Sequence, residues 1–217
     1  MTREAATFRW PDRACFGAFL LYGVLLCILW VVIYGGASWL TGLHGYRVRL
    51  DTVADAGIPF VPEASVVYLS LFPMIWLSLF ILPTPYEIRK FAKALAWLYV
   101  VSGIGFILLP AEQIHSTPPI QGPIRPVFEF ADWINLDYNF LPSLHVGMAI
   151  VCACAYAGQL HWTAAVLFWT WTAAISVSTL VTHEHYLADV LAGALVGFVV
   201  AAICFRNADA EDGERPR

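Results

Sequence analysis

The segment at residues 186–205, YLADVLAGALVGFVVAAICF, decides the fold class of this chain. Asp189 is the only formally charged side chain in it. A helix needs about 20 mostly apolar residues to cross the hydrocarbon core of a bilayer, where its backbone polar groups must bond within the segment. The segment therefore predicts a transmembrane helix that carries one carboxylate close to its beginning.

Five further apolar stretches precede this segment, at residues 15–40, 64–82, 94–109, 142–158 and 163–181. The six stretches hold 117 residues and one charge, Asp189, whereas the other 27 charges occupy the remaining 100 residues. Only 13% of the chain is charged and 59% is hydrophobic, while a soluble domain carries about 25% charged residues. We expect an all-α integral membrane bundle of six transmembrane helices, and we exclude a soluble domain.

The distribution of lysine and arginine predicts the orientation of the bundle. Nine of the twelve cations fall on the side of the N-terminus, in the segments before the first stretch, between the second and third, and after the sixth. The opposite side holds three, Arg47, Arg49 and Arg125. Under the positive-inside rule both termini are cytoplasmic. We expect one domain over 1–205 and a disordered polar cytoplasmic tail over 206–217, and no basic stripe indicates a nucleic-acid partner.

The loop between the third and fourth stretches, about 110–141, is long for a chain of this size. Apolar residues recur in it with helical spacing, at Val127, Phe130, Ala131 and Ile134. Pro126 suits a first helical turn, and nearby Trp133 and Tyr138 suit an interface. This pattern predicts a short interfacial helix on the outer face.

Asp189 needs an explanation, because an ionisable group within the apolar region costs roughly 2.5 to 3.5 kcal/mol on insertion scales. It follows His185 by four residues, so the two side chains share one face of a helix. The carboxylate can then accept a hydrogen bond from one ring nitrogen and leave the other as nucleophile or base. The alternative is that Asp189 joins neighbouring helices as a packing contact.

A second candidate site is Leu141-Pro142-Ser143-Leu144-His145, at the start of the fourth stretch. Pro142 suits the first helical position, and free amides around Ser143 at a helix N-terminus attract an anion. The hydroxyl of Ser143 adds a donor and His145 a transferable proton. The alternative is an ordinary helix start with an incidental histidine.

The predicted topology brings the two sites together on the outer face. The fourth and sixth helices both begin there, and Arg125 is the one cation of the 110–141 loop. Two histidines, an anion-binding helix start and an arginine suit phosphoryl transfer through a phosphohistidine. One imidazole would attack phosphorus while the other protonates the leaving oxygen.

These motifs resemble those of the phosphatidic acid phosphatase type 2 superfamily. Pro142-Ser143-Leu144-His145 resembles the second signature, Ser178 through His185 to Asp189 resembles the third, and Arg125-Pro126 resembles the end of the first. Their order and spacing agree, so the resemblance covers about residues 64–205.

The resemblance implies a role for each matching residue. His185 would be the nucleophile, Asp189 its orienting partner and His145 the acid that protonates the leaving group. Ser143 and Arg125 would hold phosphate, with His183 as a polar neighbour of the phosphate pocket. The family needs no metal, so no metal or other cofactor is expected.

Two departures from the family pattern concern charge. Pro118 stands where the first signature has a lysine, and Thr179 where the third has an arginine. A pocket with few cations fits a phosphodiester better than a phosphomonoester, which carries more negative charge. Leu144 and the run 178–182 look more like the branch of inositol phosphorylceramide synthases and sphingomyelin synthases. Residues 58–60, Pro62 and Tyr68 also look like that branch.

We therefore expect a membrane lipid phosphatase or phosphotransferase whose active site lies on the extracytoplasmic face. Its partners would be a phospholipid substrate and a lipid alcohol or water as acceptor, with head-group transfer between lipids favoured. One alternative is a lipid phosphate or polyprenyl diphosphate phosphatase that releases phosphate to water. Another is an inactive relative that binds or transports lipid, since two family cations are missing.

Overall fold

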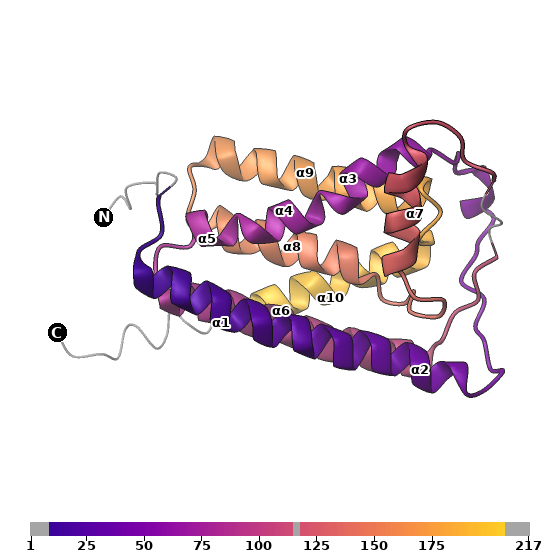
Figure 1. Ribbon diagram of the computed structural model, residues 1–217, viewed down its shortest axis with the longest axis horizontal. Helices are drawn as coiled ribbons and strands as arrows, with labels where there is room; N and C mark the ends of the chain where they lie inside the picture. The colour runs from indigo at the N-terminus through magenta and orange to yellow at the C-terminus, as the bar shows by residue number, and fades with distance from the viewer. Residues whose placement is uncertain (1–8, 115–117, 207–217) are drawn as a thin grey trace.

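A computed structural model describes residues 9–114 and 118–206 of the chain, and these residues fold as a bundle of helices (Figure 1). The α-helices are α1 Arg13–Trp30, α2 Gly36–Gly42, α3 Ser65–Leu69, α4 Leu71–Trp76, α5 Ser78–Ile81, α6 Pro85–Leu108, α7 Arg125–Ile134, α8 Leu144–Ala157, α9 Trp162–Val181 and α10 Leu187–Arg206. A π-helical turn, Val31–Gly35, joins α1 to α2, and 3₁₀ turns form at Asp55–Gly57 and Pro62–Ala64. Within the described ranges no strand forms beyond an isolated bridge between Val48 and Ala111.

Five helical segments among the described residues are long and apolar enough to cross a membrane, where six are predicted. They are Arg13–Gly42, Pro62–Ile81, Pro85–Leu108, Trp162–Val181 and Leu187–Phe205. The remaining predicted span, at 142–158, corresponds to α8, which has only 14 residues. At 1.5 Å per residue it extends about 21 Å, less than the roughly 30 Å of a hydrocarbon core. The count of six spans therefore stays a prediction.

The apolar sequence of α8 has a different cause from that of its neighbours. Twelve of its 14 residues are buried, because α4, α6, α9 and α10 all contact it. Outward-facing residues of α1, such as Leu21 and Val24, are more than half exposed. A contiguous apolar outer surface of this kind is typical of a surface that meets lipid. Thus α8 forms the protein core and the longer helices surround it.

The third apolar stretch, predicted at 94–109, begins earlier in the structure. Helix α6 starts at Pro85, where the hydroxyl of Thr84 caps the helix by accepting a hydrogen bond from the Glu87 amide at 3.1 Å. Its first turns carry charged residues, so an uncharged window alone locates the helix too far along the chain. The 24-residue helix is the longest single α-helix among those described.

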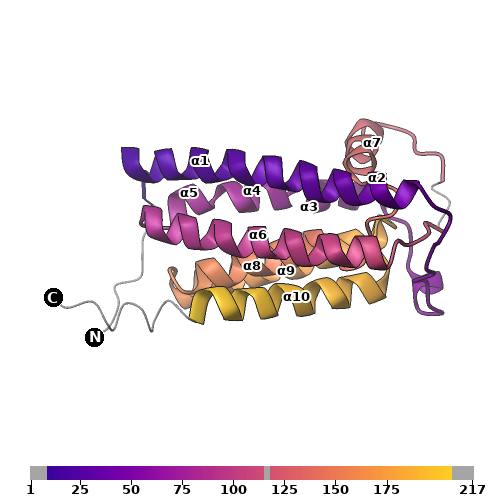
Figure 2. The same cartoon turned by 90° about the horizontal axis from the view of Figure 1, so that it is seen from below.

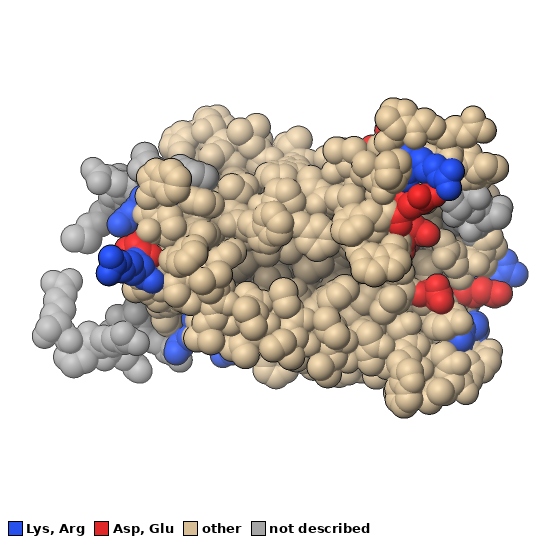
Figure 3. Space-filling view, viewed as in Figure 1, with Lys and Arg blue, Asp and Glu red and all other residues tan. Residues whose placement is uncertain are grey.

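Charged side chains gather at the two ends of the elongated molecule, and the broad middle of the visible face carries none (Figure 3). Helix α1 begins and α10 ends at one end, while α7 lies at the other (Figures 1 and 2). The apolar helices, together with the uncharged middle of this face, suggest an integral membrane protein. The cytoplasmic location of the termini stays a prediction. Of the tail predicted at 206–217, Arg206 is the last residue of α10 and 207–217 lie outside the described residues.

Helix α7 occupies the segment for which an interfacial helix is predicted. It buries Phe128 and Ala131 and leaves Phe130 and Trp133 exposed. Phe130 therefore faces outward, although its spacing places it with Ala131 on one predicted face. Exposed aromatic rings at one end of the bundle suit an interface, and the location of α7 at a membrane surface stays a prediction.

Helices α8 and α10 approach each other closely because glycine occupies their contact. A Cβ atom at Gly193 would lie 2.3 Å from the carbonyl oxygen of Ser143, far inside van der Waals contact. Gly197, four residues on, faces the backbone of Gly147 in the same way. Small residues four apart are typical of tight helix contacts in membranes. This contact places the beginning of α10 against the beginning of α8.

Gly193→Ala should destabilise the fold by about 1 to 3 kcal/mol, because the added methyl group meets backbone that can yield only if α10 moves away from α8. The measurement is the unfolding temperature of purified protein in detergent. Gly17→Ala is the matched control, since a Cβ there meets nothing within 4 Å and alanine favours a helix. Equal unfolding temperatures for the two variants would contradict the close contact.

Candidate active site

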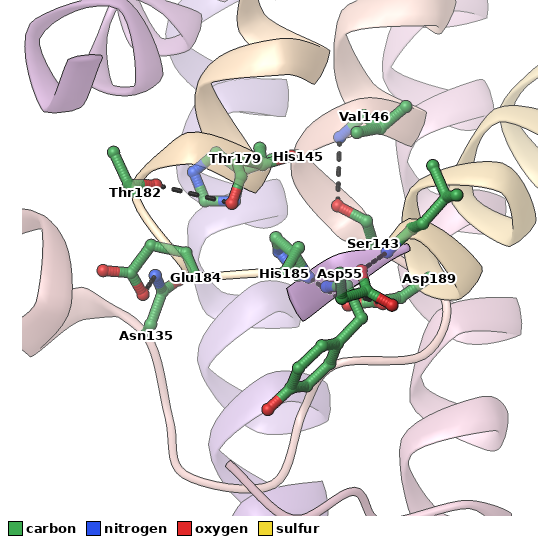
Figure 4. A network of polar contacts seen from close by, with 12 residues as sticks. Asp55, Asn135, Ser143, His145, Val146, Thr179, Thr182, Glu184, His185 and Asp189 are labelled. Atoms are coloured by element: carbon green, nitrogen blue, oxygen red, sulfur yellow. Dashed lines mark hydrogen bonds and ion pairs between the residues drawn. The ribbon is translucent and has the colours of Figure 1, made fainter. Parts of the chain in front are cut away.

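The beginning of α10 holds a buried histidine and carboxylate pair. Nδ1 of His185 lies 2.7 Å from Oδ2 of Asp189, and the two residues are 7% and 0% exposed. His185 precedes α10 by two residues, while Asp189 lies in its first turn. An ionised carboxylate only accepts hydrogen bonds, so Nδ1 carries the proton and Nε2 of the neutral ring keeps a lone pair. Figure 4 shows this pair with the surrounding polar contacts.

The backbone around this pair is tied to three other elements. The amide of His185 donates to the carbonyl of Thr179 in α9 at 3.0 Å, and the carbonyl of Asp189 accepts from the Ser143 amide at 2.9 Å. Oδ1 of buried Asp55, in the 41–63 loop, accepts from the amide of Leu187 at 2.8 Å. These contacts fix where α10 begins, and Asp55 was not among the predicted site residues.

The start of α8 differs in register from the prediction. Ser143 is the N-cap, with extended backbone, and its hydroxyl accepts from the amide of Val146 at 3.5 Å. Pro142 therefore precedes the cap, and the prediction that it takes the first helical position is wrong. The cause is competition between the two residues, because a serine hydroxyl can bond a free amide of the first turn and proline cannot. Ser143 is fully buried, and its own amide is bonded to Asp189.

His145 lies next to His185, with ring centroids 6.3 Å apart. Its Nδ1 is 3.0 Å from the hydroxyl of Tyr68, and the two rings stack at 4.0 Å. Its Nε2 is buried without a hydrogen-bond partner among the described residues. A buried polar atom without a partner is unusual in a folded protein and marks a position where a ligand can bind. Both histidines thus have Nδ1 engaged and Nε2 available.

A small cavity of about 60 Å³ opens beside His185. Three carboxylates contribute to its wall, those of Asp132, Asp137 and Glu184, and its lining includes neither lysine nor arginine. Burial raises the pKa of Glu184 to about 7, although a hydrogen bond from Asn135 opposes this shift. Burial also raises the pKa of Asp132. The space next to the candidate nucleophile is therefore acidic.

The structure does not place Arg125 in this cavity wall. Its Nε lies 2.6 Å from Oε1 of Glu129 in α7, and the side chain is 62% exposed. His183 has positive φ, and its Nε2 lies 3.1 Å from the carbonyl of Ile58 while its ring packs on Phe60. His183 thus joins the 41–63 loop to the α9–α10 connection. A phosphate-binding role for Arg125, Ser143 or His183 stays a prediction.

Three polar residues next to the histidines were not predicted to act in the site. The hydroxyl of Tyr68 donates to Oδ1 of Asn135 at 2.7 Å, and Nδ2 of Asn135 donates to Oε2 of Glu184. Glu184 is only 5% exposed and stands between two histidines in the sequence, which is a local signal. Tyr68 lies 77 residues before His145 along the chain. Asn135 lies between the Arg125-Pro126 and Pro142–His145 motifs, in a loop whose path no spacing rule predicts.

Comparison with known families gives one match. The model of the PAP2 superfamily matches residues 109–211, a range that holds both histidines, Ser143 and Asp189 but not Tyr68. No curated protein matches the chain. The family match suggests a phosphatase-type enzyme that acts on phosphate esters.

Glu184 should make the stability of the fold depend on pH. Its pKa is raised from 4.5 to about 7, so the folded state holds a proton that the unfolded state has lost across this range. The free energy of unfolding should then decrease from about pH 4.5 to pH 7, by at most about 3 to 4 kcal/mol at roughly 1.4 kcal/mol per pKa unit. Unfolding temperatures of the wild type and Glu184→Gln, measured in detergent across this range, test the point.

The slope should be smaller in Glu184→Gln. Glu129→Gln is the matched control, because it removes an exposed carboxylate from α7 and should leave the slope as in the wild type. A slope that survives Glu184→Gln unchanged would show that another group is responsible.

Proposed function

We propose that this chain is a member of the PAP2 superfamily and a membrane lipid phosphatase or phosphotransferase that works through a phosphohistidine at His185. The observation that carries the proposal is the pair of buried imidazoles, 6.3 Å apart, each held at Nδ1 and each with Nε2 available. One ring is bonded to a carboxylate and the other to a neutral hydroxyl. This difference suits a nucleophile next to an acid.

In the first half-reaction Nε2 of His185 attacks phosphorus, and the bond from phosphorus to the leaving oxygen breaks. Protonated His145 gives its Nε2 proton to that oxygen as the electron pair arrives. The Asp189 carboxylate stabilises the positive charge that develops on the His185 ring. In the second half-reaction an alcohol or water attacks phosphorus, His145 accepts its proton, and the bond from phosphorus to nitrogen breaks.

Phosphate oxygens would be held by Ser143, Arg125 and His183. Arg125 can exchange Glu129 for a phosphate at small cost, because an exposed ion pair contributes only about 0 to 1 kcal/mol. Ser143 lies at the N-terminus of α8, where the helix dipole favours an anion. No metal is required in this scheme.

The charge of the site favours a phosphodiester donor and transfer of its head group to a second lipid. Acidic residues line the cavity, and the cations of the family pattern are replaced by Pro118 and Thr179. A doubly charged monoester would meet more repulsion there than a singly charged diester. This supports a place in the branch of inositol phosphorylceramide synthases and sphingomyelin synthases. The proposal keeps the six predicted spans and a site on the extracytoplasmic face.

The second candidate is an inactive relative that binds lipid, which the same missing cations favour. The presence of His145, His185 and Asp189 together favours the enzyme, because a protein that only binds lipid does not need them. Measurement of turnover decides between the two candidates. Release of phosphate to water is the same chemistry with a different acceptor. Analysis of the products therefore distinguishes hydrolysis from head-group transfer.

His185→Ala should abolish turnover of a radiolabelled phospholipid donor, because no nitrogen remains to attack phosphorus. Asp189→Asn should lower the rate about a hundredfold or more, since it loses the charge and the tautomer control. Labelled protein trapped from the wild type should carry acid-labile phosphate on histidine. His161→Ala, which removes an exposed histidine at the other end of α9, is the control. Full activity in His185→Ala would refute the mechanism.

Addition of a lipid alcohol should divert the labelled head group from water to lipid. The assay follows purified wild-type protein with a phosphodiester donor and a panel of diacylglycerol, ceramide and polyprenol acceptors. Products are separated as free phosphate ester and labelled lipid. Preferential monoester hydrolysis, unchanged by any acceptor, would instead favour the lipid phosphate phosphatase alternative.

A further inference from the structure

His145 has a hydrogen-bonding partner, Tyr68, that lies outside the three signature motifs. The Tyr68 side chain, from α3, is fully buried, stacks on the His145 ring and lies 3.0 Å from its Nδ1. Tyr68 is in turn bonded to Asn135, which follows α7, and Asn135 to Glu184, between α9 and α10. Residues from three other parts of the bundle are thus connected to one imidazole through a single chain of polar contacts.

The direction of this chain follows from its last acceptor. Above its pKa of about 7 Glu184 is ionised and can only accept, so it takes a hydrogen from the amide of Asn135, whose oxygen then accepts the one hydroxyl hydrogen of Tyr68. The Tyr68 oxygen has no further hydrogen to donate. It must therefore accept from Nδ1–H of His145, so that Nδ1 stays protonated in both charge states of the ring.

We propose that Tyr68, held by Asn135 and Glu184, is a positioning residue that fixes the tautomer of His145 and assigns all proton transfer to its Nε2. The proposal rests on the function proposed above. In the first half-reaction the Nε2 proton passes to the leaving oxygen, and the ring remains neutral with its Nδ1 proton on Tyr68. In the second, Nε2 accepts the proton of the attacking alcohol or water, which restores the starting state.

The arrangement also explains why the two histidines have different partners. A carboxylate bonded directly to Nδ1 favours a charged ring, which suits His185 when its nitrogen bonds to phosphorus. The same contact would hold the proton on His145 too firmly for an acid. Tyr68 and Asn135 place two neutral groups between His145 and the carboxylate of Glu184, so the ring is oriented and still releases its proton.

The test separates orientation from packing by the leaving group of the donor. A dialkyl phosphodiester needs a proton on its departing oxygen, whereas a nitrophenyl ester with the same phosphoryl group leaves without one. Single-turnover release of the leaving group is measured for both donors, so transfer to an acceptor does not enter the rate. Tyr68→Phe keeps the ring and removes only the hydroxyl. It should slow the alkyl donor ten- to a hundredfold, and the nitrophenyl donor less than threefold.

Glu184→Gln should change the ratio of the two rates in the same direction, because its amide can reverse the direction of the chain. Tyr99→Phe is the matched control, since it removes another buried hydroxyl, 3.6 Å from the sulfur of Met148. That variant should leave the ratio unchanged. If Tyr68→Phe does not fold, the test rests on Glu184→Gln alone. Glu184 lies in the connection between α9 and α10, outside the helices.

The outcomes distinguish this inference from the function on which it rests. A wild type that turns over neither donor, or a His185→Ala variant that turns over both, refutes the proposed function. A wild type whose activity depends on His185, with both donors slowed equally or neither slowed in Tyr68→Phe and Glu184→Gln, overturns the positioning role alone.

Discussion

The structure depends on the compensation of one buried carboxylate. Asp189 has no exposed surface, and a bare charge in an apolar bundle would be too costly to keep. Its Oδ2 contacts His185 and its Oδ1 accepts from the amide of Tyr186, while its carbonyl accepts from Ser143. These bonds stabilise the carboxylate and also join the candidate nucleophile, the start of α10 and the cap of α8. The glycine contact one turn later, at Gly193, lets the two helices come close enough for this.

A second constraint is the low density of positive charge around the histidines. The cavity beside His185 is lined by three carboxylates and by neither lysine nor arginine, and Arg125 is paired with Glu129. Among the described residues that line this cavity no cation is present, so specific hydrogen bonds, and not nearby positive charge, orient the imidazoles. Each histidine is accordingly fixed at Nδ1, one by a carboxylate and one by Tyr68. The geometry of these bonds, more than the net charge, then determines how the two rings are oriented.

Apolar composition predicted helices well and their surroundings less well. The stretch at 142–158 has the composition of a span, yet α8 is a 14-residue helix buried among its neighbours. Lipid and a protein core select the same residue types, so composition does not distinguish them. The start of α6 was missed because charged residues fill its first turns, and Pro142 was misplaced because a serine cap outweighs a proline preference. Arg125 forms an ion pair with Glu129 on its own helix and does not line the cavity.

The sequence by itself determined the helical class and the pairing of His185 with Asp189, because four residues of chain around the start of a helix bring the two side chains together whatever surrounds them. Only the tertiary structure decided what His145 contacts. Tyr68 is 77 residues away along the chain, and Asn135 is 49 residues from Glu184. Such contacts follow from how helices pack against one another, which depends on side-chain shape across the whole bundle and leaves no regular spacing in the sequence.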